Sequence, residues 1–156
     1  MKKFLLSAGV MCVLSMPAAW ADAEAMKVVS VSDYSFTLNE QQAVSVIFGA
    51  SDYNYCSLTV LRQSVSDSFK FSSTQRSDKD ASISCTWDKK HFVQSSKHPT
   101  GLNIEILSLD KEAKKAEVSV SLKLVEPSSD EYFELNDARL LITDQGFEHL
   151  IEDNPS

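Results

Sequence analysis

Cys56 and Cys85 are the residues whose type and spacing point most directly to chemistry. The third cysteine, Cys12, lies in an N-terminal segment that we expect to be removed, so these two remain as an isolated pair. In an oxidising compartment such a pair forms a disulfide. Structural zinc takes four ligands, and no histidine is spaced near either cysteine to complete such a set. Closing a loop of roughly 30 residues stabilises a fold by about 3.6 kcal/mol through the entropy of the unfolded chain.

Local catalytic motifs are absent from the sequence. It contains no G-x-S-x-G, H-E-x-x-H or C-x-x-C pattern, and its glycines form no phosphate-binding loop. The histidines are His91, His98 and His149. A serine–histidine–aspartate triad is defined in space rather than along the chain, so a small secreted hydrolase stays open as a third interpretation. With no motif in support, we predict a protein without catalytic residues, cofactor or metal ion.

Two short stretches carry residues suited to contact with a partner. Ser51–Tyr55 combines tyrosine with serine and asparagine, as adaptable protein-binding loops do. Trp87–His91 places an aromatic residue beside the adjacent lysines Lys89 and Lys90. We predict that a partner contacts Tyr53, Tyr55, Trp87 and Lys90. The alternatives are that the tyrosines cover the outward face of a strand and that the lysines form a solvated turn.

Both cysteines lie in segments that alternate apolar and polar residues with period two, as strands buried on one face do. Tyr53–Val60 puts Cys56 on the same face as Leu58 and Val60. Ala81–Trp87 puts Cys85 on the same face as Ile83 and Trp87. A bond between the cysteines would therefore lie in the core. If the two strands are antiparallel, the bond also brings Asp52-Tyr53 close to Lys89-Lys90.

Short alternating segments continue along the rest of the chain, which shows no long helical period. Tyr34, Phe36 and Leu38 indicate one strand, and Ser72–Asp80 has the composition of a loop. Tyr132–Leu135 and Ala138–Thr143 are expected to form a hairpin around Asn136-Asp137, and Phe147–Ile151 a last short strand or helical turn. The residues expected to point inward are Leu58, Val60, Ile83, Trp87, Ile104, Ile106, Val118, Val120, Leu122 and Leu124.

About nine or ten short strands predict an all-β domain. The strands would form either two facing sheets or one sheet closed on itself. A disulfide in the core suits two sheets that face each other. We therefore predict a single-domain antiparallel β-sandwich with one disulfide.

The N-terminus has the three parts of a secretory signal peptide. Met1-Lys2-Lys3 is basic, and Phe4–Met16 is apolar but too short to span a bilayer. Ala19-Trp20-Ala21 is a cleavage pattern. We expect cleavage after Ala21, which leaves residues 22–156 as a periplasmic or secreted domain that does not insert into a membrane.

The chain is acidic, with 15 Lys and Arg against 22 Asp and Glu. Removing residues 1–21, which carry two lysines and no acid, changes the net charge from −7 to −7 − 2 = −9. Nucleic-acid binding needs clustered cations, so no nucleic-acid partner is predicted. The one basic cluster contains Lys89-Lys90-His91, Lys97 and His98, and it either docks an anionic group or forms a solvated turn.

These observations favour an exported, non-catalytic binding module that engages another protein, such as an inhibitor, an immunity protein or an envelope accessory factor. Small size, export, an acidic surface and the lack of a catalytic motif support this hypothesis. The alternative is a β-sandwich that binds carbohydrate or another envelope ligand, with Trp87 and the tyrosines as stacking surfaces.

Overall fold

A computed structural model of the protein describes residues 19–20, 23, 26–33, 38, 40–74 and 80–152. Within these ranges the backbone forms ten strands, the 3-10 helix η2 and the α-helix α1. The elements are β1 (Ala19–Trp20), β2 (Lys27–Asp33), β3 (Ala43–Ser51), β4 (Asn54–Leu61), η2 (Arg62–Ser64), β5 (Lys70–Ser73), β6 (Ala81–Trp87), β7 (Lys90–Val93), β8 (Gly101–Asp110), β9 (Lys115–Glu126), β10 (Glu131–Thr143) and α1 (Asp144–Ile151).

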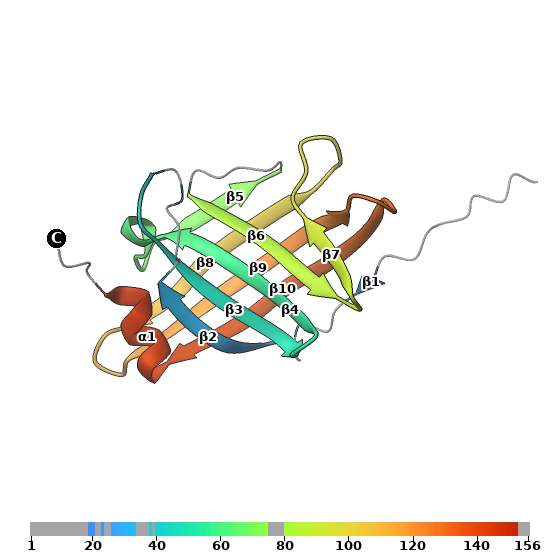
Figure 1. The fold of residues 1–156 in the computed structure, drawn as a ribbon. Helices are drawn as coiled ribbons and strands as arrows, with labels where there is room; N and C mark the ends of the chain where they lie inside the picture. Colours follow the sequence, from blue (N-terminus) through green and yellow to red (C-terminus); the bar gives the residue numbers. More distant parts are fainter. Residues whose placement is uncertain are drawn as a thin grey trace, which may run out of the picture.

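Strands β2 to β10 form two layers whose strands cross in Figure 1. The first layer has the order β2-β3-β4-β6-β7, and the second has the order β10-β9-β8-β5. The layers join through β9, because its residue Val125 pairs with Val93 of β7. All neighbours within the layers are antiparallel. The predicted antiparallel β-sandwich with one disulfide is therefore confirmed.

Alternation along the strands determines which side chains enter the core. In β9, Val118, Val120 and Leu122 are buried, whereas Ser119 and Ser121 between them are only half-buried. Successive side chains of a strand point to opposite faces, so a period of two in hydrophobicity places one face inside. Of the residues expected to point inward, all are buried except Trp87, which is partly buried and packs against the core.

The segment predicted as a hairpin around Asn136-Asp137 is instead one continuous strand, β10. Its register against β9 shifts between Leu135 and Ala138, so the two turn-type residues form a bulge. Two serines of β9 hold this bulge. The backbone N–H of Asp137 donates to Ser121 Oγ at 2.9 Å, and Ser119 Oγ donates to Asp137 Oδ1 at 2.8 Å. Because β9 supplies these partners, β10 accommodates one extra residue without reversing direction.

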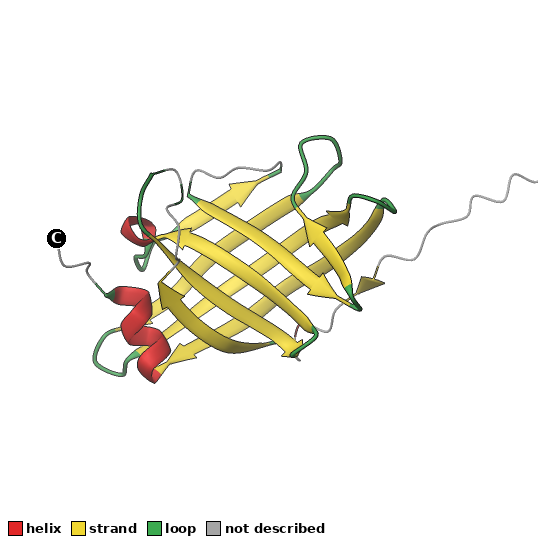
Figure 2. Ribbon diagram, in the orientation of Figure 1, coloured by secondary structure: helices red, strands yellow, loops and turns green. Residues whose placement is uncertain are grey.

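The last segment is the helix α1 rather than a strand, and it lies at one end of the sandwich (Figure 2). Phe147 and Leu150 are its buried residues, and it packs mainly against β2. The final carbonyl groups of a helix lack partners within the helix. Here Arg62 Nη1 donates to the carbonyl oxygens of His149 and Glu152 at 2.9 and 2.8 Å, while Arg62 Nη2 bonds Asp33. Arg62 thus ties the helix end to β2 and β4.

Parts of the sequence-based prediction lie outside the described residues. These parts are most of the signal peptide, residues 34–37 of one expected strand and residues 75–79 of one expected loop. Ala19 and Trp20 are described as β1, which runs parallel to β10 at Phe133 and Glu134. Cleavage after Ala21 remains a prediction, and it would remove β1 from the mature protein. Among the described helices, none is long and apolar enough to cross a membrane.

The alternation of buried and more exposed residues in the strands of the second layer leads to a direct test. Leu122→Ala should lower the free energy of unfolding by about 2–5 kcal/mol, because it opens a cavity in the core. Ser108 is exposed on β8, and Ser108→Ala should change that free energy by less than about 0.5 kcal/mol. Urea unfolding of both variants provides the measurement. Equal effects in the two variants would contradict the register of the second layer.

Candidate functional site

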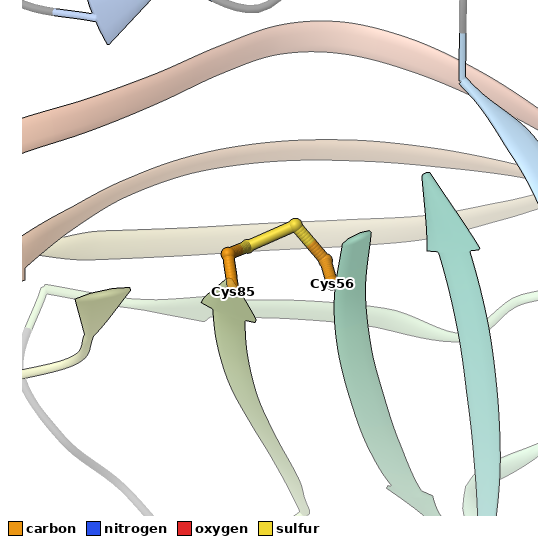
Figure 3. The surroundings of a disulfide bond; sticks show 2 residues. All are labelled: Cys56 and Cys85. Carbon is orange, nitrogen blue, oxygen red and sulfur yellow. A yellow bond between two sulfur atoms is a disulfide. The ribbon is translucent and has the colours of Figure 1, made fainter. Parts of the chain in front are cut away.

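The disulfide joins Cys56 of β4 to Cys85 of β6, which stand directly opposite each other in an antiparallel pair. Both residues are fully buried. Figure 3 shows the bond projecting from two adjacent strands toward strands of the other layer. The predicted pairing and its place in the core are confirmed. The bond connects neighbouring strands within one layer, however, and does not link the two layers. A core disulfide was therefore not a valid reason to expect two facing sheets.

Two turns lie side by side just beyond the disulfide. One joins β3 to β4 and has Asp52-Tyr53 at its tip, and the other joins β6 to β7 through Asp88-Lys89. They are adjacent because β4 and β6 are antiparallel, with Tyr55 opposite Thr86. The backbone N–H of Asp88 donates to Asn54 Oδ1 at 2.9 Å and so connects the turns directly. We call these two turns, residues 51–54 and 87–90, the paired turns.

The residues predicted to contact a partner differ in their solvent exposure and packing. Tyr53 is 78 % exposed at the tip of its turn. Tyr55 is half-buried on the outward face of β4, opposite Gly49 of β3. Trp87 packs inward, with its ring centroid 4.9 Å from that of Phe133. The alternation of β6 puts Trp87 on the same side as Cys85, where it is partly buried against the core, and its contact with a partner stays a prediction.

The lysine of the predicted set is engaged within the protein. Lys90 Nζ lies 2.5 Å from Glu131 Oε2 at the start of β10, and the Lys90 side chain is 45 % exposed. His98 Nε2 is 3.6 Å from Asp130 Oδ1 in the neighbouring β9–β10 turn. These two members of the basic cluster therefore point toward acidic residues. This arrangement favours the solvated-turn interpretation over an anion-binding site.

The β9–β10 turn keeps its negative charge. The Glu126 carboxylate accepts hydrogen bonds from the backbone N–H groups of Ser128 and Ser129 at 3.0 and 2.7 Å. A hydrogen bond from the Ser129 side chain, followed by these contacts, lowers the pKa of Glu126 from its ordinary value of 4.5. With Asp130 and Glu131 facing His98 and Lys90, acidic and basic groups lie close together at this end of the sandwich.

The histidines stand on separate elements. His91 is exposed on β7, and His149 of α1 has Nδ1 3.6 Å from Glu152 Oε2. Across the described ranges, no group of three or more His, Cys, Asp or Glu residues is arranged to hold a metal ion. No protein-family model matches the chain, and no similar curated protein or solved structure was found.

One polar surface was not predicted from the sequence. The outward positions of β2, β4 and β6 are largely serine and threonine, and the strand order places them on one face of the first layer. The signal was present in each segment as the polar half of the alternation. It could not be assembled without knowing that these strands, distant in sequence, share a layer.

Removing the disulfide should affect the whole first layer. The double variant Cys56→Ala/Cys85→Ala should lose about 3.6 kcal/mol of unfolding free energy, because the unfolded chain regains the freedom of the closed loop. Urea denaturation of the wild type with and without a reductant, beside the variant, measures this. Wild-type stability that is unaffected by complete reduction would contradict a structural role for the bond.

Proposed function

We propose that this protein is an exported, non-catalytic binding module that engages another protein through the paired turns. The observation that carries the proposal is Tyr53. Its side chain is 78 % exposed, more than the other exposed large hydrophobic residues of the described chain, Val29 and Leu141. Tyrosine is enriched among the residues that dominate protein–protein binding energy, because it combines a large apolar area with a hydroxyl group.

Rigid support for this tyrosine strengthens the proposal. Asn54 bonds the neighbouring turn through the backbone of Asp88, and Cys56 is covalently fixed two residues further on. A turn whose backbone is already held in place loses little freedom when a partner binds, so more of the contact energy of its tyrosine appears as affinity. Tyr53 on the paired turns therefore has the properties of a preorganised anchor.

Charges around the anchor suit a protein partner as well. Asp52 and Lys89 are both exposed on the paired turns, and Glu131 and Lys90 lie beside them as an ion pair. Polar groups of both signs around an aromatic centre resemble the usual anatomy of an interface, in which a polar rim surrounds a central contact. Such charges influence the choice and orientation of a partner more than the strength of binding.

Export is the second part of the proposal. Disulfides persist in oxidising compartments and are rare in the cytosol. The buried Cys56–Cys85 bond and the signal peptide predicted for residues 1–21 both fit a periplasmic or secreted protein. An inhibitor, an immunity protein or an envelope accessory factor would need this combination of export, stability and a single rigid contact surface.

A photo-crosslinking amino acid at position 53 tests the proposal. The mature protein carrying it should capture a defined protein from an envelope extract, while the same group at position 141 on the other layer should not. With the captured protein purified, Tyr53→Ala should weaken binding by about 2 kcal/mol, or roughly 30-fold. Calorimetric titration measures the affinity.

Leu141→Ala is the matched control, since it also removes an exposed apolar side chain, and it should leave the affinity unchanged. Both variants should keep the melting temperature of the wild type. Equal capture from positions 53 and 141, or an unchanged affinity in Tyr53→Ala, would contradict a binding role for the paired turns.

A further inference from the structure

The outward face of the first layer carries side chains in three rows that cross the strands. The pairing register defines each row from β2 toward β7. The first row is Ser32, Ser45, Thr59 and Ser82; the second is Ser30, Ile47, Ser57, Ser84 and Val93; the third is Lys27, Gly49, Tyr55, Thr86 and His91. We call this surface the hydroxyl face, because eight of these fourteen residues are serine or threonine.

The hydroxyl face has no acidic residue, although the chain contains 22. Its one lysine, Lys27, and its one histidine, His91, stand at the two ends of the third row. The outward face of the second layer is different, because three ion pairs lie on it beside a polar row of Ser72, Asn103 and Ser121. Those pairs are Lys70–Glu105 at 2.7 Å, Lys123–Glu134 at 2.9 Å and Arg139–Glu117 at 3.1 Å. The outward face of the second layer is thus lined with ion pairs, whereas the hydroxyl face carries one lysine, at its edge, and no acidic residue.

Six of the eight hydroxyl-bearing residues are open to solvent to some degree. Ser45 and Thr59 are buried, and a small apolar cluster of Leu38, Ala43 and Leu61 lies on this side next to them. The Oγ atoms of Ser45 and Ser57 are 3.5 Å apart. The exposed or half-buried residues are Ser30, Ser32, Ser57, Ser82, Ser84 and Thr86.

The composition of this face excludes several classes of ligand. Nucleic acids and other polyanions need clustered lysine and arginine, which the rows lack. Protein interfaces depend on aromatic and arginine anchors, and serine and threonine are under-represented among the residues that carry their energy. The larger apolar side chains of the rows are Ile47, Tyr55 and Val93, and all three are half-buried. Val29, at the β2 bulge next to Ser30, is 63 % exposed. A second protein would find few anchors on this surface.

We propose that the hydroxyl face binds a neutral polyhydroxyl chain, that is, an uncharged glycan. Each serine or threonine hydroxyl offers one donor and two acceptor lone pairs, which matches the donor and acceptor capacity of sugar hydroxyls. Neutral groups are also easier to strip of water than charged ones, so hydrogen bonds to a neutral ligand are not offset by a large desolvation penalty. Short side chains on a paired sheet lose little freedom when they bind.

The dimensions of the face suit an extended chain. Neighbouring strands are about 4.8 Å apart and successive rows about 6.8 Å apart, so five strands span roughly 20 Å. A glycan lying along the second row would meet Ser57 and Ser84 as hydrogen-bonding groups, with Ile47 and Val93 against its C–H faces. Tyr55 adds an aromatic ring beside Thr86 in the adjacent row. This site is separate from the paired turns and does not depend on the proposed protein partner.

Nuclear magnetic resonance titration of the mature protein tests the proposal with maltopentaose, cellopentaose and penta-N-acetylchitopentaose as probes. At least one probe should shift the amide signals of Ser57, Ser84 and Thr86 in a saturable way. The amides of Ser119 and Ser121, on the outward side of the second layer, should not move. Absence of saturable shifts with all three probes at millimolar concentration would overturn the proposal, as would shifts confined to the paired turns or to the second layer.

A pair of double variants tests the role of the hydroxyl groups themselves. Ser57→Ala/Ser84→Ala should weaken binding of the active probe by about tenfold or more, because two hydrogen bonds are lost. Ser72→Ala/Ser108→Ala, which removes two hydroxyls from the second layer, should leave it unchanged. Equal affinities in the two double variants, at equal melting temperatures, would overturn the proposal. The crosslinking experiment at position 53 probes the paired turns, which lie outside the hydroxyl face. The two proposals can therefore fail independently.

Discussion

The covalent bond between Cys56 and Cys85 fixes the register of the first layer. These residues are directly opposite each other, so the bond permits one alignment of β4 and β6. A slip by one residue would turn every side chain of a strand to the other face. The correct alignment puts Leu58 and Ile83 in the core and Ser57 and Ser84 on the outside. Both candidate surfaces therefore depend on this one constraint.

The same alignment explains why both proposed binding surfaces lie in the first layer. It brings the two turns beyond the bond together and aligns hydroxyl groups from four strands, β2, β3, β4 and β6, into rows. The second layer has one shorter polar row, Ser72, Asn103 and Ser121, and pairs its outward charges in ion pairs such as Lys123–Glu134. In an acidic protein, a face without acidic residues and a turn with an exposed tyrosine at its tip are the two surfaces proposed for binding.

Local alternation was enough to predict the strands and most of the core, because burial of one face imposes a period of two wherever a strand occurs. It failed where distant partners decide the outcome. The bulge at Asp137 forms because Ser119 of β9 donates a hydrogen bond to the Asp137 carboxylate and Ser121 accepts one from the Asp137 backbone N–H. The end of α1 is bonded by Arg62, which is 87 residues from His149 in sequence. Neither interaction has a local signature.

The candidate site was predictable to a similar extent. Proximity of the two turns followed from the disulfide and from an assumed antiparallel pairing, which the structure confirms. The inward position of Trp87 was implied by its phase with Cys85, but its aromatic character suggested contact with a partner. The hydroxyl face required the order β2-β3-β4-β6-β7, and strand order is a non-local property that no single segment encodes.

Hydrogen exchange at the backbone N–H of Asp88 tests most directly whether the disulfide holds the paired turns together. In the oxidised protein this amide should be protected, because it donates to Asn54 Oδ1 across the two turns. In Cys56→Ala/Cys85→Ala its protection should fall sharply. The amide of Ala113, which donates to Asp110 Oδ1 at 2.8 Å within a single turn of the second layer, should be much less affected. Equal changes at Asp88 and Ala113, or no change at Asp88, would contradict the account.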